Sequence, residues 1–185
     1  MSQPTPTFTT TSPSSLIRLL QGITPLLSSF TTGLSLSLSV ILVPRLLESP
    51  SPLILRQWLS AFHQGKKLIP GLSILSSLGY FLLSWWHFHP SGGSSTNGRL
   101  SKIYLLAGVA TLSIVPYTRI IMWPTNLKLM AKEEEFSSWG VDHVLVTEEE
   151  EKGAKYLVDH WGLLNLGRAG LVGLAAVLGL GAGYI

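Results

Sequence analysis

The sequence predicts an all-α integral membrane protein, a four-helix bundle with a short interfacial helix between its first and second spans. One observation is composition: 46% of the 185 residues are hydrophobic and only 12% are charged, about half the usual charged share. The other is a set of four apolar runs, at 23–43, 68–86, 103–123 and 163–185. Each has about 20 residues, the length at which a helix crosses a hydrocarbon core of ~30 Å.

The same composition excludes several classes of site. The chain has no cysteine, so disulfides, thiolate metal sites, iron–sulfur clusters and cysteine nucleophiles are excluded. The net charge is only +3 and the basic residues are scattered, unlike the basic stripe of a nucleic-acid-binding protein. We therefore expect one membrane domain over 16–185. It follows a tail at 1–15 that is rich in Ser, Thr and Pro and is predicted to be disordered.

The first span is interrupted by serines and threonines and is expected to end at Pro44. Small residues recur at every fourth position in three of the runs, a spacing that lets helices approach closely in lipid. These residues are Ser29, Gly33 and Ser37, then Ala107 and Thr111, then Ala175, Gly179 and Gly183.

The connection at 48–67 mixes aromatic and polar residues. Trp58 and Phe62 stand beside Arg56 and His63, a pattern that favours a short amphipathic helix lying at the interface and leading into the second span. The residues at 152–160 are expected to run as a helix into the fourth span.

The third span carries Arg119 where an apolar residue is expected. A cation there costs several kcal/mol on insertion scales unless it is paired or reaches water. Pro116 lies one turn earlier and predicts a kink, which suits a pocket. The run is expected to end at Pro124.

The fourth run opens with a second polar group, Trp161, Asn165 and Arg168, which share one helix face at i, i+4 and i+7. With an even number of spans, this group and Arg119 lie near the same membrane boundary. The sequence therefore predicts a site there. The alternative is that the arginines reach toward the headgroups and the tryptophans form an interfacial belt.

His63 is the candidate general base, because an imidazole titrates near neutral pH. An interfacial polar residue is the equally open reading. A haem or copper ion held through His63 also stays open. His87 and His89 flank Phe88 at a span end, where an interfacial cap is favoured over a pair of metal ligands.

Two short motifs carry a family resemblance: Pro124-Thr125-Asn126-Leu127 after the third span, and Trp161-x-x-x-Asn165-x-x-Arg168 at the start of the fourth. With four spans and this length, the chain resembles the DUF1772 family of small membrane proteins, whose characterised fungal members are anthrone oxygenases. The resemblance covers roughly residue 23 to the C-terminus. It implies oxidation of a polyketide-derived anthrone to the anthraquinone by dioxygen, in aromatic polyketide biosynthesis.

The resemblance implies a flat lipophilic aromatic substrate, membrane lipid as surroundings, no nucleic acid, and no cofactor besides dioxygen as co-substrate. We expect a multi-pass protein of an endomembrane. A non-catalytic four-span protein that binds or transports a lipophilic metabolite is the alternative. The expected roles are His63 as base; Arg119, Asn126, Asn165 and Arg168 as donors; and Trp161, Trp123 and Thr125 as substrate-binding residues.

Overall fold

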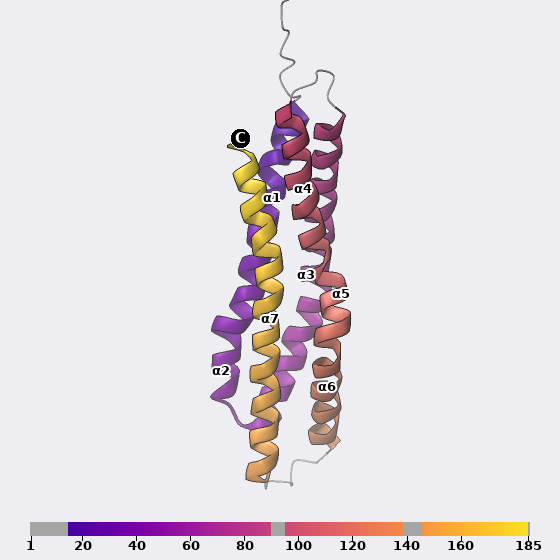
Figure 1. Cartoon of the computed structure of the whole chain (residues 1–185). Helices are drawn as coiled ribbons and strands as arrows, with labels where there is room; N and C mark the ends of the chain where they lie inside the picture. Colours follow the sequence, from indigo (N-terminus) through magenta and orange to yellow (C-terminus); the bar gives the residue numbers. More distant parts are fainter. Residues whose placement is uncertain (1–14, 90–94, 139–145, 185) are drawn as a thin grey trace, which may run out of the picture.

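The computed structural model of this protein describes residues 15–89, 95–138 and 146–184, and all the regular structure in these ranges is helical. Four long helical stretches run up and down beside one another (Figure 1). The fold-class prediction of an all-α bundle is confirmed. The predicted disordered tail lies outside the described residues, except that Ser15 already begins the first helix.

The four stretches comprise nine helical elements within the described ranges. The first stretch holds α1 (Ser15–Ser37), the π-helical turn η1 (Leu38–Leu42) and α2 (Val43–Leu47), and the second is α3 (Ser51–Phe88). The third holds α4 (Ser95–Leu112), α5 (Ile114–Tyr117), the π-helical turn η2 (Thr118–Met122) and α6 (Trp123–Ser138), and the fourth is α7 (Glu148–Ala182).

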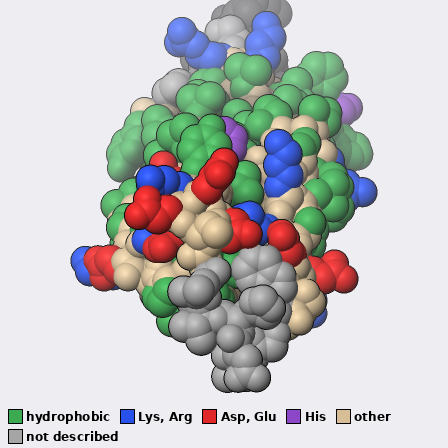
Figure 2. Space-filling model, turned by 90° about the horizontal axis from the view of Figure 1, so that it is seen from below, with side chains coloured by type: hydrophobic (Ala, Val, Ile, Leu, Met, Phe, Trp, Pro, Cys, Tyr) green, Lys and Arg blue, Asp and Glu red, His purple; other side chains and the backbone are tan. Residues whose placement is uncertain are grey.

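All four stretches are long and apolar enough to cross a membrane. They are also longer than a bilayer requires: the 35 residues of α7 span roughly 50 Å at the helical rise per residue, against a core of ~30 Å. Acidic and basic side chains gather at the lower end, with hydrophobic ones around the sides (Figure 2). A bilayer therefore covers only part of the length of such helices.

The predicted separate interfacial helix is wrong. Residues 51–88 form one continuous helix, α3, and its first half packs into the bundle instead of lying flat on the membrane. Trp58 is completely buried and Phe62 nearly so, and both belong to one apolar core with Trp161 of α7. The aromatic residues that predicted an interfacial helix contact protein instead of headgroups.

The helices continue past the predicted span ends at Pro44 and Pro124, to Leu47 and Ser138. Each proline comes two residues after the end of a π-helical turn. A proline ring clashes with the carbonyl four residues back in a regular α-helix, and the wider preceding turn lets that helix continue. The irregularity predicted at Pro116 is present, since the helix is interrupted at Ser113 and η2 begins at Thr118.

The prediction that the small residues lie at helix contacts is correct for some of them and wrong for others. Ala107, Thr111, Ala175 and Gly179 are buried as expected. In α1 the predicted face is wrong: Ser29 and Gly33 are exposed, as is Gly183 at the end of α7. The face of α1 that is buried carries other small polar residues, which are Thr24, Ser28, Thr31 and Ser35. Both faces of α1 have the same helical spacing, so composition alone did not separate them.

Candidate functional site

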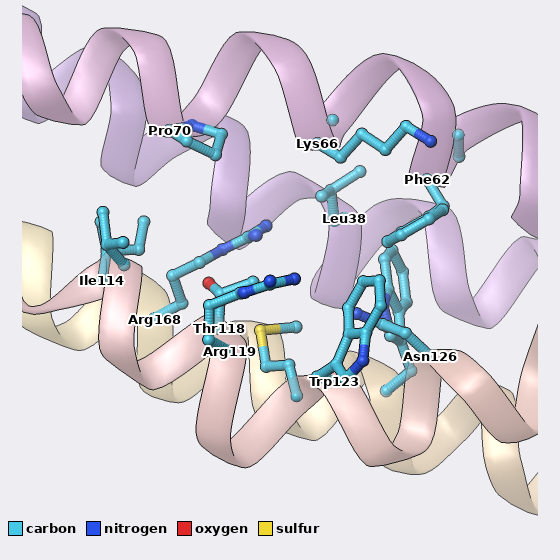
Figure 3. Close-up of a pocket in the computed structure, with 15 residues that line it drawn as sticks. Leu38, Phe62, Lys66, Pro70, Ile114, Thr118, Arg119, Trp123, Asn126 and Arg168 are labelled. Atoms are coloured by element: carbon cyan, nitrogen blue, oxygen red, sulfur yellow. The ribbon is translucent and has the colours of Figure 1, made fainter.

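A cavity of about 310 Å³ lies in the lower half of the bundle, between α3, the η2–α6 stretch and α7 (Figure 3). This volume is at the lower end of the range for small-molecule sites, which are concave, mostly apolar and carry a few placed polar groups. Its lining residues are Leu38, Ala61, Phe62, Gly65, Lys66, Pro70, Ile114, Val115, Thr118, Arg119, Met122, Trp123, Asn126, Trp161 and Arg168.

Arg168 is the deepest charged group at this cavity. It is only 5% exposed, and one of its terminal nitrogens donates to Asn165 Oδ1. Asn165 is fully buried, and its Nδ2 donates to the Trp161 carbonyl over 2.8 Å. The predicted group on α7 is therefore a chain of contacts, in which Trp161 and Arg168 line the cavity while Asn165 lies behind and orients Arg168.

Arg119 reaches the same cavity from η2, and its guanidinium lies 5.0 Å from the centre of the Trp123 ring. That distance is within the range of a cation–π contact. In Figure 3 the side chains of Arg119 and Arg168 both extend into the cavity, one from each of two helices. The two arginines that the sequence places near one membrane boundary thus line the same cavity.

Asn126 lines the cavity from α6, one turn after Trp123, and is 1% exposed. Its Oδ1 is buried without a hydrogen-bond partner among the described residues. The Nε of Arg168 is in the same state. Because buried polar groups are normally hydrogen-bonded, this acceptor and this donor are available to a ligand in the cavity that both residues line. Thr125 is buried beside Asn126 but is absent from the cavity lining.

Aromatic rings close one end of the cavity. The rings of Trp58 and Phe62 stack with their centres 5.2 Å apart and 13° between planes, and the Trp161 ring meets Trp58 edge-on at 6.0 Å. Phe62 and Trp161 line the cavity from this cluster. Flat rings at this end offer stacking surface for a planar guest.

Tyr117 fixes α5 against α7 beside this site, because its hydroxyl donates to the Leu164 carbonyl over 3.0 Å. Gly167 permits the approach: a Cβ at that position would overlap the Tyr117 hydroxyl. The bond places α5 and the start of η2 at a set distance from the Asn165–Arg168 turn.

His63 stands apart from the other candidates. It is exposed and is not part of the cavity lining, although its ring lies 6.0 Å from that of Phe62. The structure therefore does not bring His63 together with the arginines, and its role as base remains a prediction. Within the described ranges, no cluster of three or more His, Asp or Glu side chains is placed to hold a metal ion.

The sequence analysis missed two features of the site. Lys66 lines the cavity from α3, and the signal that could have found it is its spacing of four residues from Phe62 on a helix that continues through the boundary. The other is the pair of π-helical turns, from which Leu38, Thr118, Arg119 and Met122 reach the cavity. Such turns are frequent at functional sites.

A second cavity of about 390 Å³ lies on the α1 side of α3. It shares Leu38, Ala61 and Gly65 with the first. The small residues Ala61 and Gly65, one turn apart, are therefore the part of α3 that separates the two spaces.

These features define a class: a multi-pass helical membrane protein whose mostly apolar cavity carries cationic and amide groups. Residues 58–178 match the family model described as anthrone oxygenase. The chain belongs to the anthrone oxygenase family, a family of oxidoreductases. The resemblance predicted from the two motifs is confirmed.

Among its relatives is a noranthrone monooxygenase of Aspergillus flavus, 30% identical over 84% of this chain and 69% of that protein. An anthrone oxygenase of Emericella nidulans is 29% identical over 83% of this chain and 91% of its own length. The anthrone oxygenase encC of Aspergillus fumigatus is 32% identical over 77% of this chain and 80% of that protein. No solved structure matches the chain.

Proposed function

We propose that this protein oxidises a polyketide-derived anthrone to the anthraquinone with dioxygen, as a monooxygenase of aromatic polyketide biosynthesis. The observation that carries the proposal is the cavity, in which Arg119, Asn126 and Arg168 meet an aromatic wall. The names of the relatives support the same reaction. An anthrone is flat and apolar, so it partitions into lipid and can reach a site at the level where the spans leave the membrane.

The reaction needs one methylene carbon and one molecule of dioxygen. Loss of a methylene proton leaves a carbanion that is delocalised into the aromatic rings. This anion transfers one electron to dioxygen, and recombination of the two radicals forms a carbon–oxygen bond. The resulting peroxide anion takes up one proton, which replaces the one lost from the methylene, and the hydroperoxide so formed loses its remaining C–H proton as the O–O bond breaks. One oxygen atom stays as the new carbonyl and the other leaves as water, so atoms and electrons balance without a further reductant.

The chain's own residues supply binding and charge stabilisation in this proposal. Arg168, held by Asn165, and Arg119 donate to the oxygen on which negative charge develops, where a preorganised donor is worth most. Asn126 fixes a hydroxyl of the substrate, and Trp161 with Trp123 provides stacking surface. Thr125, behind Asn126, supports it. Asn165 acts through Arg168 and is a positioning residue.

The proposal is tested with membranes that contain the protein and are supplied with an anthrone. We expect anthraquinone to form faster than in empty membranes under air, and at the background rate under nitrogen. With ¹⁸O₂, one labelled atom enters each quinone. Asn165→Leu is expected to abolish the excess rate while the protein still inserts and accumulates. Equal rates in filled and empty membranes would contradict the proposal and favour a non-catalytic binding protein.

The base is tested separately. His63 is exposed and outside the cavity lining, so a role as base requires proton transfer through water or a movement of the side chain. If His63 is the base, His63→Ala slows oxidation and changes the dependence of the rate on pH. An unchanged rate in His63→Ala would remove this assignment and leave the oxygenase proposal intact. Placement in an endomembrane is proposed as well, and microscopy of the tagged full chain tests it.

A further inference from the structure

Three cations from three helical elements line the cavity: Lys66 from α3, Arg119 from η2 and Arg168 from α7. No Asp, Glu or His is among the lining residues. The ion pairs in the described part of the chain join Arg45 to Glu48, Lys152 to Glu148 and Lys155 to Glu151. The three cavity cations thus have no carboxylate within ion-pair distance in the described part.

Lys66 and Arg119 are exposed and keep much of their hydration, so without a ligand the unfavourable free energy falls mainly on the buried Arg168. Like charges that share one space repel one another, and a buried cation without a counter-ion loses hydration that nothing replaces. Arg168 is the strongest case, because it is 5% exposed and its Nε has no hydrogen-bond partner among the described residues. A ligand that carries negative charge removes both costs at once.

We infer that the cavity takes its ligand as an anion, with Lys66 as a third anion-binding residue beside Arg119 and Arg168. This inference rests on the proposed function and deepens it: the substrate class becomes acidic anthrones, phenols that are held in their ionised form. The ligand's negative charge lies between Arg168 at the inner end and Lys66 at the α3 side. Anthrones without an acidic hydroxyl are poor ligands.

The position of Lys66 supports this role. Its Nζ lies 5.3 Å from the centre of the Phe62 ring, and both residues line the cavity. In Figure 3 its side chain runs along α3 toward Phe62, on the opposite side of the cavity from Arg119. A flat anion stacked near Phe62 and Trp161 therefore has a cation on each of its two edges.

Lys67, the next residue, provides a matched control. It has the same charge and length and is exposed, but it does not line the cavity. Lys66→Met and Lys67→Met remove the same charge from the same helix and the same membrane level. A general effect of surface charge appears in both variants, whereas a site effect appears only in the first.

The probe is an anthraquinone with hydroxyl groups on both sides of one carbonyl, which cannot be oxidised by the proposed reaction and changes colour when it ionises. The full-length protein in lipid nanodiscs is titrated with this dye at several pH values. We expect bound dye to ionise at lower pH than free dye, with the ratio of ionised to neutral form raised at least about tenfold, the effect of one nearby opposite charge.

Lys66→Met is expected to lose a large part of this shift and Lys66→Arg to retain it, while Lys67→Met leaves it unchanged. The dimethoxy analogue of the dye has no acidic hydrogen. We expect it to bind the wild-type protein at least about tenfold more weakly than the dye does, whereas the analogue and the dye bind Arg168→Gln equally well.

Dye that binds only in its neutral form overturns the inference. So does an equal effect of Lys66→Met and Lys67→Met, or a failure of the dye to bind a protein that still oxidises the anthrone. The dye titrations themselves do not require turnover. If the anthrone is not oxidised but the dye ionises on binding, the proposed function fails and the anion site stands.

Discussion

The upper and lower halves of this bundle consist of the same four helical stretches but differ in how side chains fill the space between them. In the upper half, glycines allow aromatic rings to pack against neighbouring backbones: a Cβ on Gly179 would lie 2.5 Å from the Tyr80 hydroxyl, and one on Gly108 would lie 2.7 Å from Phe81. In the lower half, Gly162 and Gly167 allow close approaches as well, but the helices also leave a cavity, which large side chains such as Trp123 and Arg168 line.

The polar groups differ in the same sense. The upper half carries neutral hydroxyls that bond to backbone across helices: Tyr80 donates to the Ala175 carbonyl over 2.9 Å, and Ser84 donates to the Ser101 carbonyl over 2.9 Å. In the lower half, the cavity cations Lys66, Arg119 and Arg168 have no carboxylate partner in the described ranges, whereas the ion pairs at Glu48, Glu148 and Glu151 lie outside the cavity lining. We infer that both halves contribute apolar core to the stability of the bundle, whereas the charged cavity of the lower half carries its chemistry.

The largest expected effect is a loss of turnover at Arg168 without a matching loss of stability. We expect Arg168→Met to lower turnover by about 100- to 1000-fold, the effect of removing one preorganised oxyanion donor. Its thermal midpoint should change little, because loss of an uncompensated buried charge offsets loss of the bond to Asn165. Oxygen uptake and thermal unfolding in nanodiscs measure the two. Leu174→Met, exposed on the same helix, controls for insertion, and a strongly lowered midpoint in Arg168→Met would break the comparison.

A smaller effect, a loss of stability, is expected in the upper half, where Gly179→Val forces the Tyr80 ring away from α7. Overpacking of this kind costs about 1–3 kcal/mol, and the Tyr80 bond to Ala175 is lost as well. The folded fraction should retain the wild-type KM. Gly181→Val is the matched control, since nothing lies within 4 Å of a Cβ there. Equal loss of stability in both variants would mean that helix propensity, not packing against Tyr80, explains it.

The smallest effect is expected outside both halves, at the start of α7. Thr147 and Glu150 form a capping box, and Thr147→Ala should cost about 1 kcal/mol without changing turnover. Hydrogen bonds from Thr147 lower the pKa of the Glu150 carboxyl. The contribution of this carboxylate is therefore present above its unfolded pKa and is lost as the pH falls through the lower folded value. Thermal unfolding across acidic pH should show a weaker dependence in the variant; an unchanged dependence would contradict this account.

The two motifs, and the family resemblance that they carry, could be found in the sequence because the residues of each motif lie close together along the chain. Trp161, Asn165 and Arg168 share a face in any α-helix, and an even number of spans brings them to the boundary that Arg119 also reaches. The same reasoning grouped His63 with the arginines, although it lies outside the cavity lining, and it missed Lys66, because which face of α3 meets the cavity depends on how α6 and α7 pack against it.

Length, composition and helical periodicity by themselves predicted four spans and the shared face of Trp161, Asn165 and Arg168, and the two short motifs carried the family resemblance. Tertiary structure alone decided which side chains share a space. The physical reason is that the two π-helical turns break the 3.6-residue period just before Pro44 and Pro124, so the directions of Leu38 and Arg119 follow from packing around the prolines and not from counting along the chain.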